Sequence, residues 1–377
     1  MLSLWFPVNG LDLYASYAAG VAARHGSSPY DLTVYLETWD SLHPPPTVAE
    51  SRVLPFAYPP SWIPFAMALS LAPWSAALAG WKLVSAAALV GLVLLLLRGP
   101  YADELDEGDR YAVWCFALTL SPTLSVLVMG QSSLFIAFML VLSAACLERR
   151  RVVASGLALA LAAMKPQLTA AYILFLLLRG ELRVLAIGAA GNLLLSGLGL
   201  YATGVRLDQY LDAAARWSAN NPATGHINVG IASLLAHLTS LSLGTVTVIG
   251  LLAGAALVAA LAFARGTRER GAFAELLPLV LLAAALGFRC NAYDLVVLIP
   301  LFAWARAHRT PPTLGRAIQA LLLVLLVPRA ALHRAYETLA AGRVPYDAYY
   351  VGEITFRSWV LVLLLPLVIL AWRARRA

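Results

Sequence analysis

Long apolar runs, separated by short polar or charged stretches, make up most of this chain of 377 residues. A helix needs about 20 mostly apolar residues to cross the hydrocarbon core of a bilayer. The clearest candidates are residues 74–97, 111–128, 182–203, 245–264, 273–287, 318–328 and 354–372. The pattern therefore predicts an all-α protein, folded as a polytopic bundle of transmembrane helices.

Further apolar runs are shorter and bounded by polar residues, at 132–147, 152–164, 168–178 and 293–304. Transmembrane helices that break usually do so around a functional cavity, because free backbone groups need polar partners there. The runs at 61–71 and 228–238 predict short interfacial or half-spanning helices on the outer face. The short runs thus indicate a cavity within the bundle.

Clusters of basic residues set the expected orientation, because cytoplasmic loops are enriched in Arg and Lys. The clusters lie at 148–151, 179–183, 265–270, 306–316 and 373–376. Placing them inside predicts about 11 spanning helices, with the C-terminus inside. Residues 1–60, 130–131, 165–166, 204–244, 289–291 and 329–353 then lie outside.

We expect one integral-membrane domain over residues 1–377. It comprises a first outer loop (1–60), the core membrane helices (61–287), and C-terminal helices (288–377) that include the outer loop 329–353. No signal sequence or spanning helix precedes the first loop in this sequence to translocate it. We therefore expect that a first transmembrane helix is missing and that residues 1–8 are its outer end.

Composition narrows the class of protein. Hydrophobic residues form 61% of the chain and charged residues 12%, whereas about a quarter of a soluble domain is charged. A soluble globular protein is therefore excluded. The net charge of +7 comes from arginines in loops, which are expected as topological anchors and do not indicate nucleic-acid binding.

Neither a metal nor another cofactor is expected. The three cysteines are far apart and match neither a disulfide framework nor a zinc-ligand spacing. The first loop has no acidic cluster and no Asp-x-Asp spacing, so a tightly bound metal is not predicted.

Asp12 is a candidate general base in the first loop. A carboxylate held against the bilayer loses water, which raises its pKa toward neutrality. It also precedes an expected helix from Leu13 to Ala23, so it is also a candidate N-cap, and the two roles are compatible. Asp31 follows Pro29-Tyr30 and is typical of a turn or cap. Tyr58 precedes Pro59-Pro60, where it is either a substrate contact or part of an entry turn in the interfacial aromatic belt.

Two cationic breaks are candidate sites for an anionic group. Lys165 stands before Pro166 between apolar runs, and an ionisable residue at membrane depth indicates function. It either binds an anion or extends to the interface. Arg289 has a guanidinium suited to phosphate, or it forms an ion pair with Asp294.

Outer-face polar residues are candidate contacts for a sugar or a lipid head group. Gln131 lies in an uncharged turn and either binds a hydroxyl group or only completes the turn. Asn221 and His226 occupy a loop with amides and an aromatic residue, which is also compatible with an ordinary turn. His333 and Arg334 belong to the basic and aromatic loop 329–353, where solvated loop charges are the alternative.

Several short fragments of the residues discussed above occur in an order that resembles the integral-membrane glycosyltransferases of the GT-C superfamily, specifically glycosyltransferase family 87. The fragments that carry the resemblance are Asp12-Leu-Tyr14-Ala-Ser-Tyr17, Ser28-Pro29-Tyr30-Asp31, Tyr58-Pro59-Pro60, Gly130-Gln131, Lys165-Pro166 and Tyr293-Asp294. The family places a spanning helix before the first loop, and this chain does not.

The resemblance implies transfer of a sugar, mannose first among candidates, from a polyprenyl-phosphate donor to a glycolipid or cell-envelope glycan on the non-cytoplasmic face. It implies inversion with Asp12 as base. The donor phosphate would meet Lys165, Arg289, His333 and Arg334, and the substrates would meet Tyr14, Tyr17, Tyr58, Gln131, Asn221, His226 and Tyr293. The closest alternative is a pentose donor such as a polyprenyl-phosphate arabinose. A transporter or lipid flippase is the alternative from another class.

Overall fold

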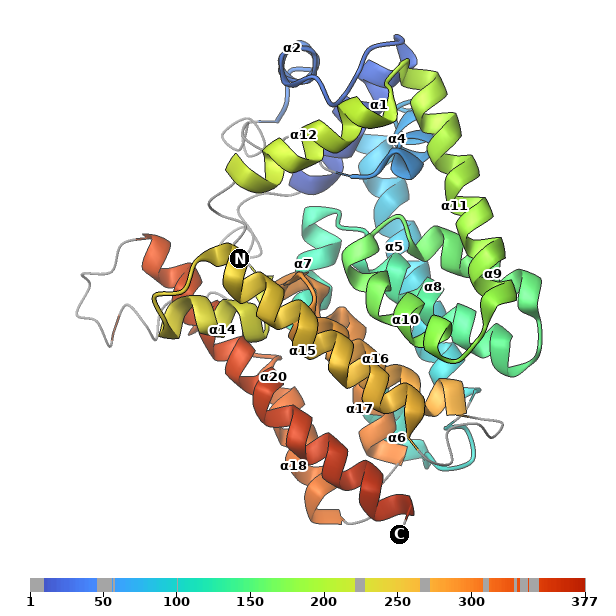
Figure 1. The fold of residues 1–377 in the computed structure, drawn as a ribbon, viewed down its shortest axis with the longest axis vertical. Coiled ribbons are helices and arrows are strands. Elements are labelled where there is room, and N and C mark those ends of the chain that lie inside the picture. The colour runs from blue at the N-terminus through green and yellow to red at the C-terminus, as the bar shows by residue number, and fades with distance from the viewer. Residues whose placement is uncertain are drawn as a thin grey trace.

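The computed structural model describes residues 10–45, 56, 58–99, 101–220, 228–264, 272–307, 312–328, 331–332, 338 and 346–376. These residues form helices joined by short connections, together with one pairing of two-residue strands. The all-α prediction is therefore confirmed except for this strand pair. Figure 1 shows the N-terminal helices at one end of the molecule and the C-terminal helices at the other.

Within the described residues, four helices are long and apolar enough to span a membrane. They are α5 (Trp74–Leu97), α11 (Leu182–Thr203), α15 (Leu243–Phe263) and the part of α20 (Tyr346–Arg376) from Glu353 to Ala374. The protein is therefore a polytopic helical membrane protein.

The run expected as one helix at 111–128 is broken. It forms α6 (Glu107–Thr119) and α7 (Ser121–Met129), which meet at an angle of 46°. Pro122 lies in the first turn of α7, where proline is tolerated because that N–H has no partner within a helix. Counted as one bent span, this pair brings the candidate spans to five.

The remaining elements are short, as the polar interruptions predict. They are α1 (Leu11–Arg24), α2 (Leu32–Ser41), η2 (Pro60–Trp62), α4 (Ile63–Leu69), α8 (Ser133–Glu148), α9 (Val152–Ala162), α10 (Pro166–Leu178), α12 (Leu207–Asn220), β1 (Asn228–Val229), α14 (Ile231–Leu238), α16 (Ala272–Gly287), β2 (Cys290–Asn291), η3 (Ala292–Leu298), α17 (Ile299–Ala307) and α18 (Pro312–Val324).

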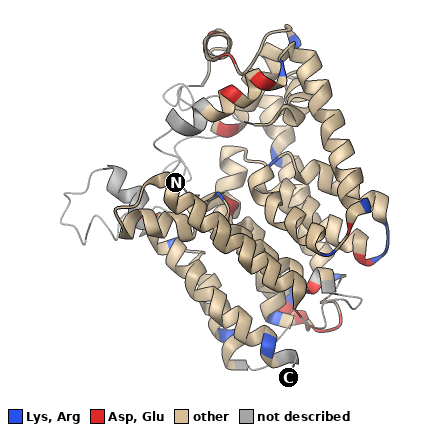
Figure 2. Ribbon diagram, in the orientation of Figure 1, with Lys and Arg blue, Asp and Glu red and all other residues tan. Residues whose placement is uncertain are grey.

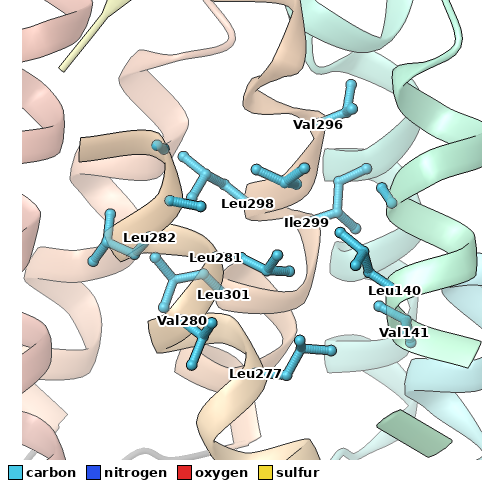
Figure 3. Close-up of a cluster of buried hydrophobic side chains, with 14 of the residues drawn as sticks. Leu140, Val141, Leu277, Val280, Leu281, Leu282, Val296, Leu298, Ile299 and Leu301 are labelled. Atoms are coloured by element: carbon cyan, nitrogen blue, oxygen red, sulfur yellow. The ribbon is translucent and has the colours of Figure 1, made fainter. Parts of the chain in front are cut away.

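Two hydrophobic clusters hold these elements together. The larger one is built mainly from α5 to α10 and α16 to α20. Figure 3 shows its centre, where α8, α16, η3 and α17 contribute Leu140, Leu281, Val296 and Ile299 among others. The smaller cluster joins α1, α2 and α4 to the segment around Trp62. Charged residues lie mostly at helix ends and in connections, and long stretches of helix carry none (Figure 2).

Helix α1 is held by close backbone contacts. An ideal Cβ placed on Gly20 would lie 2.0 Å from the carbonyl oxygen of Ala66 on α4, so only glycine allows this crossing. At the start of α1, the N–H of Gly10 donates to the carbonyl oxygen of Val128 in α7 at 2.7 Å. These contacts fix Asp12, two residues after Gly10, relative to the end of α7.

We predict that Gly20→Ala lowers stability by about 1–3 kcal/mol, because the added methyl group must displace backbone. Gly80→Ala in α5 is the matched control, since a Cβ there meets nothing within 4 Å. The control is expected to be neutral or to gain up to about 1 kcal/mol from reduced chain entropy. Thermal unfolding in detergent compares the two variants, and equal midpoints would contradict the close crossing.

Candidate active site

Asp12 lies in the first turn of α1 and is not its N-cap. The cap position is occupied by Gly10, in a left-handed conformation with φ of 81°. The N-cap alternative is therefore wrong, because the helix begins two residues earlier than the apolar pattern indicated. Asp31, by contrast, is confirmed as a cap: its Oδ1 accepts from the N–H groups of Thr33 and Val34 at the start of α2.

The Asp12 carboxylate is half satisfied. Its Oδ2 is buried and has no hydrogen-bond partner among the described residues. The side chain makes a hydrogen bond with Gln131. Helix α1, which carries Asp12, is not among the candidate membrane spans. Burial raises the pKa of Asp12 to about 6. The hydrogen bond from Gln131 and the charge of Lys165 lower this pKa, and the charge of Asp294 adds a small increase. Asp12 is therefore a carboxylate poised to take a proton near neutral pH.

Gln131 follows the turn that ends α7 and is buried, with 3% of its surface exposed. Gly130 adopts φ of 73°, and a Cβ there would lie 2.6 Å from the Cβ of Leu13. Glycine thus allows this turn to approach α1 directly beside Asp12. The Gln131 Oε1 accepts from the Tyr58 hydroxyl at 3.2 Å and from the Lys165 ammonium at 3.4 Å.

Lys165 lies between α9 and α10 and is buried, with 2% of its surface exposed. Its Nζ donates to Asp294 Oδ1 at 2.6 Å and to Ser133 Oγ at 2.8 Å, in addition to Gln131. It also lies 5.0 Å from the centre of the Tyr293 ring. The alternative of a side chain extending to the interface is wrong, since the ammonium is enclosed by protein. Its role in binding an anion stays a prediction.

Asp294 is the counterion of Lys165, and its side chain is fully buried. Its Oδ1 also accepts from Ser133 Oγ at 2.5 Å, and its Oδ2 accepts from the N–H of Asn291 at 3.0 Å. The last bond is half of a capping box at the start of η3. The alternative of an Arg289–Asp294 ion pair is therefore wrong, because Asp294 pairs with Lys165.

Arg289 lies just before β2 and is partly exposed. An electrostatic interaction links Arg289 to Tyr293, whose ring contacts Lys165. Tyr293 accepts a hydrogen bond at 2.7 Å from the side-chain amide of Asn291. β2 pairs with β1, with Asn228 opposite Asn291. The pairing connects the segment after α12 to the site, a contact that the apolar pattern gave no sign of.

The aromatic candidates separate into two groups. Tyr58 reaches the site through its hydroxyl and stacks on Trp62, with ring centres 5.0 Å apart. Tyr14 packs edge-on against Trp39 and Trp74, in the smaller hydrophobic cluster. Tyr17 lies farther along α1 and donates to the carbonyl oxygen of Ala72 at 2.9 Å. Asn221, His226, His333 and Arg334 lie outside the described residues.

Sequence reasoning missed Ser133 and the pairing of Asp294 with Lys165. The signal for Ser133 was the polar turn itself. A second serine at the start of an apolar helix costs free energy on burial unless its hydroxyl is hydrogen-bonded, so it indicates a polar partner. Among the described residues, no group of three or more His, Cys, Asp or Glu side chains could hold a metal ion.

The fold and the cluster define an integral membrane protein with a polar site where broken helices meet. Compared with known families, the chain matches Glycosyltransferase family 87 (GT87) over residues 56–290. This match covers more than half of the 377 residues. The chain belongs to glycosyltransferase family 87, and it is a glycosyltransferase. No curated protein and no solved structure matches it.

Family membership confirms the resemblance and favours an enzyme over a transporter. The matched range contains Tyr58, Gln131, Lys165 and Arg289, whereas Asp12 lies before it. The roles of individual residues therefore depend on the geometry of the site.

We predict that Asp294→Asn destabilises the protein by about 3–5 kcal/mol, because it leaves the buried Lys165 charge without its counterion. The double variant Asp294→Asn with Lys165→Met is expected to lose less than the sum of the two single variants. Thermal unfolding of all three in detergent measures this coupling. Additive losses would show that the pair does not interact in the folded protein.

Proposed function

We propose that the protein transfers a sugar, with mannose as the first candidate, from a polyprenyl-phosphate donor to a glycolipid or cell-envelope glycan acceptor. In this proposal the helices cross the cell membrane about 11 times, as the basic clusters predict, and the site opens on the non-cytoplasmic face. The observation that carries the proposal is the Asp12 carboxylate, whose buried Oδ2 has no partner among the described residues.

The proposed step is a single displacement. The acceptor hydroxyl oxygen forms a bond to the anomeric carbon while the bond from that carbon to the phosphate oxygen breaks. The hydroxyl proton passes to Asp12, and the polyprenyl phosphate leaves with the electron pair. Attack from the face opposite the phosphate inverts the anomeric centre, so a β-linked donor gives an α-linked product.

Negative charge grows on the departing phosphate, so a fixed cation beside it stabilises the transition state more than the ground state. Arg289 is the cation that we propose for this task. Arg289 is partly exposed and interacts electrostatically with Tyr293, and a guanidinium carries several N–H donors that suit an oxyanion. Tyr58 and Tyr293 are proposed as sugar contacts, because Tyr58 contacts Gln131 and Tyr293 contacts Lys165.

We predict that Asp12→Asn lowers sugar transfer by about 100-fold or more, since loss of a general base typically costs 10²–10⁴. Membranes containing the variant would be incubated with a panel of labelled polyprenyl-phosphate sugars. Asp31→Asn is the matched control: it replaces an exposed cap residue by an equally good cap and should retain full activity. Undiminished transfer by Asp12→Asn would contradict the assignment of the base.

The pH profile gives an independent prediction. Asp12 accepts a proton only when ionised, so kcat/KM should fall as pH drops through about 6, the raised pKa of this carboxyl. Below this value the rate should fall about tenfold per pH unit. Initial rates between pH 4.5 and 8 measure the limb. A midpoint near 4, the usual value for an aspartate, would contradict the role of burial.

A further inference from the structure

Lys165 has a complete set of partners inside the protein. An ammonium group has three N–H donors, and Nζ of Lys165 has three side-chain acceptors: Asp294, Ser133 and Gln131. The charge of Lys165 is balanced by Asp294 at 2.6 Å, and both side chains are almost fully buried. An incoming phosphate would have to displace one of these acceptors, so the pair is a poor anion site as it stands.

The partners of Gln131 determine which way its amide points. Two donors, Tyr58 and Lys165, converge on Oε1. The NH₂ end cannot accept hydrogen bonds, and the Lys165 ammonium can only donate, so reversing the amide would place donors against donors at Lys165. The NH₂ end is therefore the part of Gln131 that faces Asp12 and makes the side-chain hydrogen bond with it.

This bond engages one oxygen of Asp12 and leaves the other, Oδ2, buried without a partner among the described residues. A base needs such an arrangement: one oxygen held in place and the other available to the acceptor hydroxyl. A continuous path thus runs from Asp294 through Lys165 and Gln131 to Asp12. It connects η3, the α9–α10 break, the α7–α8 turn and the start of α1.

We infer that Lys165 is a positioning residue for the base: neutralised by Asp294, it fixes the amide of Gln131, which in turn orients the Asp12 carboxylate. The inference rests on the proposed function, in which Asp12 is the base, and it assigns Lys165 a different task from contact with the donor phosphate. Gln131 affects the reaction indirectly, through its hydrogen bond with Asp12.

The prediction for pH depends on every charged or titratable group that faces Asp12. Besides Lys165 and Asp294, these are three tyrosines: Tyr35 on α2, Tyr58 before η2 and Tyr293 on η3. Gln131 itself does not titrate. Replacing Gln131 therefore changes the hydrogen bonding of Asp12 without adding or removing a charge.

Gln131→Met is the sharpest test, because it removes the amide and leaves the Lys165–Asp294 pair intact. The acid limb of kcat/KM should move to higher pH by on the order of one unit, since the ionised carboxylate loses its hydrogen bond. We expect kcat to fall at least about tenfold, with the KM for the donor within about twofold. Gln319→Met is the matched control: Gln319 is a half-buried amide bonded to Arg306 and Ala305 on another part of the protein, and its loss should not move the limb.

Lys165→Met tests the alternative role directly. If Lys165 is a positioning residue, its loss lowers kcat and shifts the acid limb of the pH profile in the same direction as Gln131→Met does. If Lys165 instead binds the donor phosphate, its loss raises the KM for the donor at least about tenfold with kcat retained, and this result would overturn the inference. Where the single variant fails to fold, kcat and the KM for the donor are measured instead on the neutral double variant Lys165→Met with Asp294→Asn.

Asp12→Asn, measured in parallel, separates this inference from the proposed function. Full activity of Asp12→Asn overturns the base itself. Loss of activity in Asp12→Asn, combined with an unchanged limb and kcat in Gln131→Met, overturns only the positioning role.

Discussion

The buried ion pair between Lys165 and Asp294 is the contact on which the site depends. Each charge alone would be costly in the interior of a membrane protein, and the two residues are 129 positions apart in the sequence. Their attraction requires that the α9–α10 break and the start of η3 lie side by side. Ser133, hydrogen-bonded to both partners, adds the start of α8 to the same point.

The site is built from helix ends, because a break in a helix exposes polar groups and lets the chain change direction. Gly130 ends α7 in a left-handed turn, and Pro166 opens α10 directly after Lys165. Helix α1 joins from the other hydrophobic cluster through the close crossing at Gly20 and the backbone bond from Gly10. Asp12 is thereby placed on a separately packed helix, and the turn at Gln131 connects the two parts.

Several parts of the site were predictable from the chain alone. A lysine before a proline between apolar runs indicated the break at Lys165, and a polar turn without charge indicated Gln131. The partners were less predictable: an ion pair of Asp294 with Arg289, five positions away, was one of two alternatives, yet Asp294 pairs with Lys165. Tyr17, close to Asp12 in sequence, bonds instead to the backbone of Ala72, because residues five apart on a helix point in different directions.

The sequence by itself determined that this is a helical membrane protein, where its helices break, and to which family it belongs. Those properties follow from local composition, since lipid excludes unpaired backbone and charge wherever they occur along the chain. Only the tertiary structure decided which polar residues meet. The contacts of Asp12 with Gln131 and of Lys165 with Asp294 join segments more than a hundred residues apart, and such contacts depend on how the helices pack rather than on the residues around each one.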